Sequence, residues 1–127
     1  DERDPGALVT ALAHIPWGCW WSTPFARWQG PLAELHSLRL AAHVAGPALA
    51  ARGIDPADLD FGVLGMTVPQ RGCFYGLPWV AGLLGAPQLA GPTVMQACAT
   101  SARILEVAAG EVQSGRATAA LVLAADR

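Results

Sequence analysis

The amino-acid sequence predicts an α/β fold with a parallel or mostly parallel sheet. Two observations support this class. Short, continuously apolar segments alternate with longer segments in which apolar residues recur every three or four positions. Continuously apolar strands are typical of sheets that helices cover on both faces. The chain has 127 residues, a length that fits one domain of ordinary size.

The first third of the chain contains a predicted strand, a loop and a long helix. We expect the strand at 7–13 and a loop rich in Pro, Gly and Trp at 14–30. Apolar residues of the segment 32–52 fall on one helical face, which predicts a helix there. Pro47 is expected to kink or interrupt this helix, and Gly53 is a suitable terminator.

The remaining elements continue the alternation of strands and helices. Asp55 can cap a short helical turn that begins at Pro56. Gly85 and Gly115 are expected to end the two helices that follow. The expected elements are a strand at 61–68, a helix at 78–84, a strand at 91–95, a helix at 100–114 and a strand at 119–125.

Composition and charge exclude several classes of function. The formal net charge is -2, so the chain offers no basic surface for nucleic acid or anionic lipid. No apolar run reaches the roughly 18 residues that cross a bilayer. Only 14% of the residues are charged, which suggests that other protein covers part of the surface and predicts a homo- or hetero-oligomer. We therefore expect neither nucleic acid nor membrane among its partners.

The three cysteines are widely spaced and form no Cys-x-x-Cys pair. This pattern argues against a disulfide framework and against a metal site, and it fits a reducing, cytoplasmic compartment. The sequence therefore predicts no metal site, and any special cysteine is expected to act as a free thiol.

Cys98 lies where the predicted strand at 91–95 gives way to the predicted helix at 100–114. Unpaired N–H groups and the helix dipole at such a junction favour negative charge and lower the pKa of a thiol. Small residues, Ala97 and Ala99, flank it and leave room for a substrate carbonyl. From these residues alone, two interpretations stay open: a nucleophile, or a small residue of the core.

Four motifs carry a resemblance to a known family. Residues 23–30 read Thr-Pro-Phe-Ala-Arg-Trp-Gln-Gly, and residues 53–60 read Gly-Ile-Asp-Pro-Ala-Asp-Leu-Asp. Residues 94–98 read Val-Met-Gln-Ala-Cys, and residues 109–117 read Ala-Gly-Glu-Val-Gln-Ser-Gly-Arg-Ala. In order and spacing, these motifs resemble the first part of the thiolase family, with Cys98 in the place of its nucleophilic cysteine.

The resemblance implies a fold and a chemistry. The fold would be a layered α/β arrangement of two related halves, and residues 1–127 would be a partial N-terminal domain with a mixed, mostly parallel sheet. Cys98 would form an acyl-enzyme from a coenzyme A thioester, with no permanently bound cofactor. The family's activating His and second acid/base Cys belong to the other half, so we expect the remainder of the fold, in the same polypeptide or a partner chain, to complete the site.

The chain also departs from the family pattern. Met95 replaces an Asn, and Ala-Thr-Ser replaces Gly-Ser-Gly after the cysteine. These changes suggest an altered acyl pocket, for which Met95, Phe74 and Tyr75 are the candidate substrate-binding residues. The tryptophans of 17–21 are interpreted as an interface, and His14 as a minor candidate for the missing base.

Three functions remain open from the sequence. The first is a cytoplasmic, bacterial acyl-CoA acyltransferase of the thiolase class, catalysing thiolysis or Claisen-type condensation. The second is a non-catalytic thiolase-like subunit or acyl-CoA-binding scaffold. The third is a ketoacyl-synthase-like condensing enzyme, because a Cys-Ala-Thr-Ser turn also suits that relative.

Overall fold

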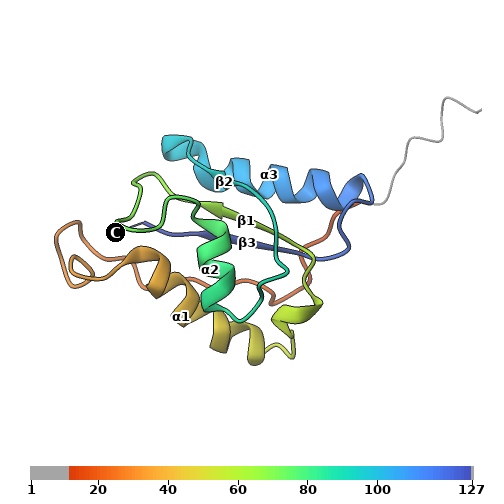
Figure 1. Cartoon of the computed structure of the whole chain (residues 1–127), viewed down its shortest axis with the longest axis horizontal. Coiled ribbons are helices and arrows are strands. Elements are labelled where there is room, and N and C mark those ends of the chain that lie inside the picture. The colour runs from red at the N-terminus through yellow and green to blue at the C-terminus, as the bar shows by residue number, and fades with distance from the viewer. Residues whose placement is uncertain (1–11, 127) are drawn as a thin grey trace, which may run out of the picture.

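The computed structural model describes residues 12–126, which form a parallel sheet of three strands and the helices around it (Figure 1). The strand order is β2–β1–β3, and β1 pairs with β3 in register from Phe61 opposite Ala120 to Gly65 opposite Ala124. The helices and strands are α1 (Ser37–Ala50), β1 (Phe61–Gly65), α2 (Leu77–Leu83), β2 (Thr93–Val94), α3 (Thr100–Gln113) and β3 (Ala120–Ala124), with 3₁₀ turns η1 (Pro56–Asp58) and η2 (Ala97–Ala99).

Helices cover both faces of the sheet. Figure 1 shows α3 on one face of the sheet and α1 and α2 on the other. Side chains alternate along β1 accordingly: Leu64 belongs to the core cluster with α1 and α2, whereas Val63 packs with Ile104 and Ala108 of α3. This period of two in a doubly covered strand explains why the strand is apolar throughout. The α/β class predicted from the sequence is confirmed.

The helix predicted at 32–52 begins later than expected, at Ser37. Residues 31–35 instead form consecutive turns, closed by bonds such as Leu35 N–H to the Leu32 carbonyl. Leu35 is exposed, so no burial stabilises a helix there. Pro47 lies inside α1 without ending it, and it is exposed, on the solvent side of the helix. The expectation that Pro47 interrupts the helix was therefore wrong.

The strands are shorter than predicted. β1 ends at Gly65, three residues before the expected end, and β2 has two residues where five were expected. The strand expected at 7–13 lies outside the described residues apart from Leu12 and Ala13, which belong to no strand. Asp55 caps η1 as predicted, because its carboxylate accepts the Ala57 N–H at 2.9 Å. All three described strands are parallel, in agreement with the mostly parallel sheet that was expected.

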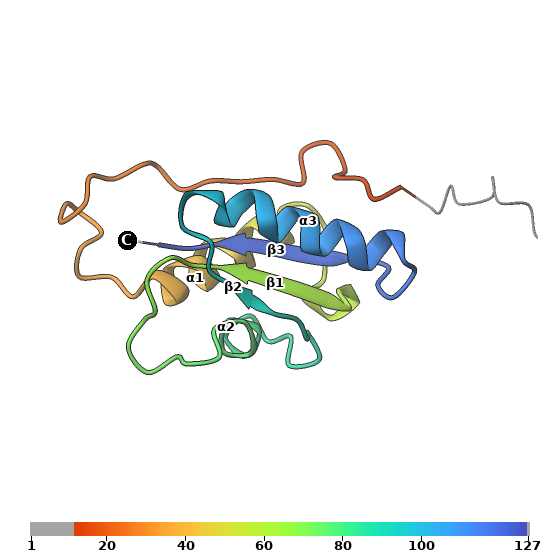
Figure 2. The same ribbon diagram turned by 90° about the horizontal axis from the view of Figure 1, so that it is seen from above.

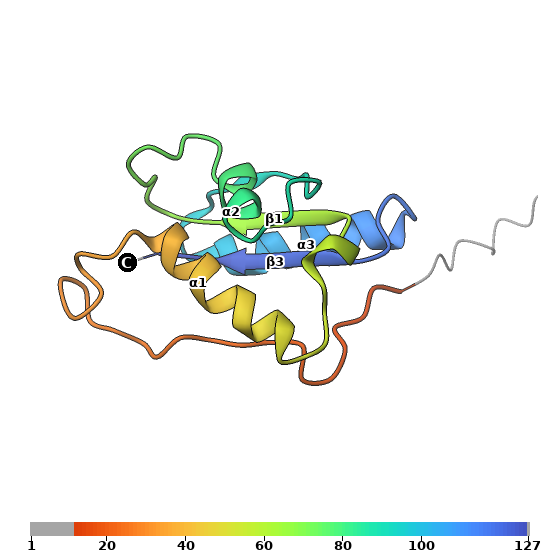
Figure 3. The same ribbon diagram turned by 60° about the horizontal axis from the view of Figure 1, so that its bottom comes forward.

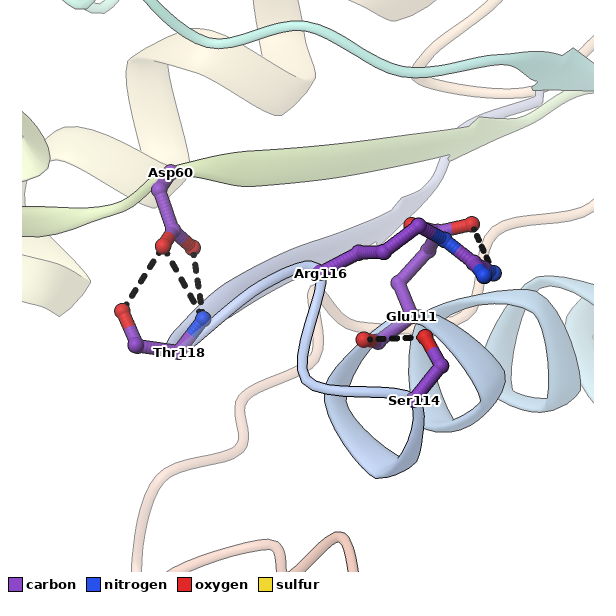
Figure 4. A network of polar contacts seen from close by, with 5 residues as sticks. All are labelled: Asp60, Glu111, Ser114, Arg116 and Thr118. Atoms are coloured by element: carbon purple, nitrogen blue, oxygen red, sulfur yellow. Dashed lines mark hydrogen bonds and ion pairs between the residues drawn. The ribbon is translucent and has the colours of Figure 1, made fainter.

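Two Asp–Thr pairs fasten β1 to β3 at opposite ends. Before β1, the Asp60 carboxylate accepts the backbone N–H and the hydroxyl of Thr118, the latter at 2.7 Å (Figure 4). After β3, Asp126 accepts the N–H and hydroxyl of Thr67 at 2.9 and 2.8 Å. Figure 4 also shows the Glu111–Arg116 ion pair at the end of α3. These polar contacts hold the register of the two strands.

The Asp60 contacts give the fold a specific acid sensitivity. Hydrogen bonds from Thr118 and Ala119 lower the pKa of Asp60 from 3.8 to about 2. A carboxyl whose pKa is lower when folded contributes stability above pH 3.8, and that contribution is lost as the pH falls towards 2. Replacing Asp60 with Asn should therefore flatten the dependence of the unfolding midpoint on pH in this window. Urea titrations at a series of pH values measure the unfolding midpoint. If the midpoint of the Asn variant depends on pH as steeply as that of the wild type, Asp60 is not the source of the acid sensitivity.

The segment 12–35 runs the length of the molecule from one end of the sheet to the other (Figures 2 and 3). Arg52, just beyond α1, fastens it by donating to the carbonyls of Gly18 and Trp20 at 2.6 and 2.7 Å. The same guanidinium lies 5.5 Å from the centre of the Trp21 ring. Trp17 and Trp20 stay exposed on this segment. Within residues 12–126, no helix has the length and apolar character that a bilayer crossing requires.

Candidate active site

Cys98 lies in η2, the short turn that joins β2 to α3, and its side chain is exposed. The chain after β1 turns to the α2 face of the sheet, whereas the chain after β2 turns to the α3 face (Figure 2). In open α/β sheets, ligands bind outside the carboxyl ends of the strands where consecutive connections diverge in this way. The thiol thus occupies the position in this sheet where a ligand site is expected.

The turn that carries Cys98 has an unusual backbone. Ala97 adopts a φ of 46°, one of two non-glycine residues with positive φ in the described part of the chain. This left-handed conformation costs an alanine roughly 1–2 kcal/mol, and such strain concentrates at functional sites. The turn closes with a hydrogen bond from Ala99 N–H to the Gln96 carbonyl at 3.0 Å. A sharp strand-to-helix turn of this kind presents the side chain at its tip.

The Cys98 thiol and its backbone N–H have no hydrogen-bond partner among residues 12–126. An exposed thiol is a nucleophile, and an unpaired backbone N–H at a helix start is a donor suited to a developing oxyanion. Arg103, one turn into α3, donates to the Gln96 side chain at 2.9 Å and pairs with Glu106 at 2.7 Å. Its charge is therefore already partly satisfied.

The predicted substrate-binding residues follow the same edge of the sheet. Met95 comes directly after β2 and is 56% exposed, while Phe74 and Tyr75 lie in the loop after β1 and are more exposed still. The Thr93 hydroxyl donates to the Tyr75 carbonyl at 2.7 Å and so ties that loop to β2. The structure therefore brings the Tyr75 loop beside the strand that leads to Cys98.

A cavity of roughly 350 Å³ lies farther along this edge, and the predicted substrate-binding residues do not line it. Its lining is residues 23–29, Leu32, Ala33 and Asp126. Most of the first family-like motif, 23–30, thus lines this cavity beside the end of β3. Sequence reasoning missed Asp126; its signal was an acidic residue directly after the last apolar strand.

Cys73 is a buried thiol of a different kind. Its Sγ donates to the Gln70 carbonyl at 3.2 Å and lies 3.6 Å from His36 Nε2. Burial raises the pKa of Cys73, which keeps the sulfur protonated. His36 Nε2 is also 3.1 Å from the Arg71 carbonyl, so this histidine is engaged in the loop after β1. In the part of the chain that the structure describes, no three His, Cys, Asp or Glu side chains are grouped to hold a metal.

Comparison by sequence finds a relative among the beta-ketoacyl synthases. No protein-family model matches the chain. It is 35% identical over 88 residues to beta-ketoacyl-acyl-carrier-protein synthase III 2 of Streptomyces avermitilis. The aligned region covers 69% of this chain and 28% of that protein. The chain therefore spans well under a third of this relative's length.

Solved structures share the fold. The 3-oxoacyl-(acyl carrier protein) synthase III of Pseudomonas aeruginosa PAO1 is 26% identical with a TM-score of 0.63, covering 73% of this chain and 28% of that one. Acetyl-CoA acetyltransferase of Bacillus anthracis is 22% identical with a TM-score of 0.67, covering 74% and 24%.

Human mitochondrial 3-ketoacyl-CoA thiolase is 21% identical with a TM-score of 0.68, covering 75% of this chain and 25% of that one. The two enzymes under 25% identity show the fold alone. These thiolase and synthase structures thus share the fold of this chain. The chain therefore has a thiolase-like fold, as its motifs predicted.

Proposed function

We propose that this chain is the nucleophile-bearing part of a thiolase-fold acyltransferase, in which Cys98 receives an acyl group from a thioester. The observation that carries the proposal is the exposed, unpartnered thiol at the strained turn between β2 and α3. Residues 1–127 would form a partial N-terminal domain. The remainder of the fold, in the same polypeptide or in a partner chain, would supply the base.

The first half-reaction follows from the chemistry of a thiol and a thioester. The Cys98 sulfur forms a bond to the thioester carbonyl carbon, and the carbonyl oxygen takes the negative charge of the tetrahedral intermediate. The Cys98 backbone N–H is the group that can donate a hydrogen bond to that oxygen. The intermediate then expels the donor's sulfur, which leaves as a thiol with the proton that Cys98 has lost.

A coenzyme A thioester is the acyl donor that we propose, with no permanently bound cofactor. The thiolase neighbours support this choice, one of them having been solved in complex with CoA. Thiolysis would return the acyl group to a second CoA thiol, and condensation would transfer it to an enolate. Met95, Phe74 and Tyr75 are proposed to contact the acyl chain, since they follow the same edge of the sheet as Cys98.

A ketoacyl-synthase-like condensing reaction is the second candidate. The 35% identity to a beta-ketoacyl-acyl-carrier-protein synthase III supports it. Two acyl donors separate the candidates: an acyl-CoA and the same acyl group on an acyl carrier protein. Acylation from CoA supports the first function, and acylation from the carrier protein alone supports the second. A complete protein that binds acyl-CoA but stays unacylated would be a non-catalytic scaffold, which contradicts the proposal.

Selective alkylation of Cys98 is the simplest prediction of this function. In the complete protein, iodoacetamide should modify Cys98 at least about tenfold faster than Cys73, because Cys98 is exposed and Cys73 is buried with a raised pKa. Mass spectrometry of quenched time points gives the rate for each cysteine. A saturating acyl-CoA should protect Cys98 and leave the rate of the half-buried Cys19 unchanged. Equal, slow labelling of all three cysteines would contradict a nucleophilic role.

The cellular setting of this function is also a proposal. We propose a homo- or hetero-oligomer in the bacterial cytoplasm. Bacterial relatives support the origin. The exposed Trp17 and Trp20 support a covered surface, because large aromatic side chains are enriched at interfaces.

A further inference from the structure

The Thr100 side chain bridges the two residues that precede Cys98. Its hydroxyl accepts the Gln96 backbone N–H at 2.8 Å and donates to the Ala97 carbonyl at 2.7 Å. The Thr100 backbone N–H also reaches the Ala97 carbonyl. One buried side chain, 6% exposed, therefore binds the peptide unit before Gln96 and the peptide unit that joins Ala97 to Cys98.

The rest of the Thr100 side chain is seated on the sheet. A Cβ added to Gly65, the last residue of β1, would lie 2.7 Å from Thr100 Cγ2 and 3.1 Å from Ile104 Cδ1. Only a glycine at this position lets the start of α3 approach β1 so closely. The methyl group of Thr100 thus packs against β1, while its hydroxyl forms hydrogen bonds to the turn before Cys98.

The turn needs such a fixed point because Ala97 is in a left-handed conformation, with a φ of 46°. An L-residue with a Cβ keeps this conformation only where its surroundings enforce it. Thr100 supplies the contacts that do so from the side of α3. Without its hydroxyl, Ala97 is expected to relax, and the direction of the Cys98 side chain changes with it.

We propose that Thr100 is a positioning residue for the nucleophile: its hydroxyl holds the 96–98 turn so that the Cys98 sulfur and backbone N–H face the same substrate carbonyl. This inference rests on the proposed acyl transfer to Cys98 and deepens it. Thr100 is not proposed to contact the substrate. Thr100 is proposed to affect the rate of the acylation step and to leave substrate binding nearly unchanged.

The test compares three variants of the complete protein. Thr100→Val removes the hydroxyl and keeps the shape, Thr100→Ser keeps the hydroxyl, and Thr118→Val removes a threonine hydroxyl bond at the opposite end of the sheet. Thr100→Val should lower kcat for acylation about 10- to 100-fold with little change in KM, as misplacement of a reacting group does. Thr100→Ser should stay within about threefold of the wild type, and Thr118→Val should leave kcat unchanged.

Equal kcat values in Thr100→Val and Thr118→Val, at matched thermal unfolding temperatures, would overturn the positioning role. If Thr100→Val does not fold, Thr100→Ala is compared with Thr100→Ser, because these two variants both lack the methyl group and differ only in the hydroxyl. The iodoacetamide rate at Cys98 separates this inference from the proposed function. A reactive, acylated Cys98 that is indifferent to Thr100 refutes the positioning role alone, whereas a wild-type protein that is never acylated refutes the function.

Discussion

Replacing Cys98 with Ala should abolish acylation of the complete protein and lower its acyl-transfer rate by about 10³-fold or more, because covalent catalysis has no second route without its nucleophile. The exposed position of the side chain predicts little effect on folding. The measurement is the steady-state rate with an acyl-CoA, together with the thermal unfolding temperature.

Cys73→Ala and Cys19→Ala are the matched controls for this substitution. Both should keep the acyl-transfer rate within a few-fold of the wild type, although Cys73→Ala removes a buried side chain and should lower the unfolding temperature. If the Cys98→Ala protein still transfers acyl groups at the wild-type rate, another residue must be the nucleophile, and our assignment is refuted.

Replacing Gly91 with Ala should destabilise the fold more than any other glycine-to-alanine change that we consider. Gly91 has a φ of 154°, and a Cβ there would overlap the carbonyl oxygen of Gly62. The flanking residues bond to β1, with the Ala90 carbonyl accepting Gly62 N–H and the Pro92 carbonyl accepting Leu64 N–H. The chain cannot move away without breaking these bonds. We expect a loss of about 3 kcal/mol or more in the free energy of unfolding.

Gly110→Ala is the control for Gly91→Ala. Gly110 lies within α3, is exposed, and has open space where its Cβ would be. Alanine favours the helix by roughly 0.5–1 kcal/mol, so this variant should be slightly more stable than the wild type. Urea unfolding of the complete protein measures both. Equal unfolding midpoints for the two variants would contradict the close approach of the 90–92 segment to β1.

Local patterns predicted the helices and strands well where burial and sequence period agree. The apolar strand β1, the cap at Asp55 and the helix after Cys98 all follow from short-range signals. The start of α1 could not be predicted in this way. Leu32 and Leu35 continue the helical spacing of apolar residues, but Leu35 is exposed in the structure and the helix begins only at Ser37. Periodicity cannot reveal whether a neighbouring element covers a given apolar position.

The position of the candidate nucleophile could be predicted from local sequence signals, but the contacts around it could not. Cys98 sits at a strand-to-helix junction that the sequence marks directly. The bridge made by Thr100 depends on the left-handed conformation of Ala97, which no sequence rule assigns to an alanine. The contact between Asp126 and Thr67 joins residues 59 positions apart, so only the paired strands bring them together.

The position of a trapped acyl group tests the central claim most directly. The complete protein is mixed with an acyl-CoA, quenched in acid and digested with trypsin. Because the chain has no Lys and no Arg between Arg71 and Arg103, Cys73 and Cys98 share one peptide, and fragment ions between them must locate the added mass. We predict that one acyl group is found on Cys98. An acyl group on Cys73, or no acyl group at all, would contradict the account.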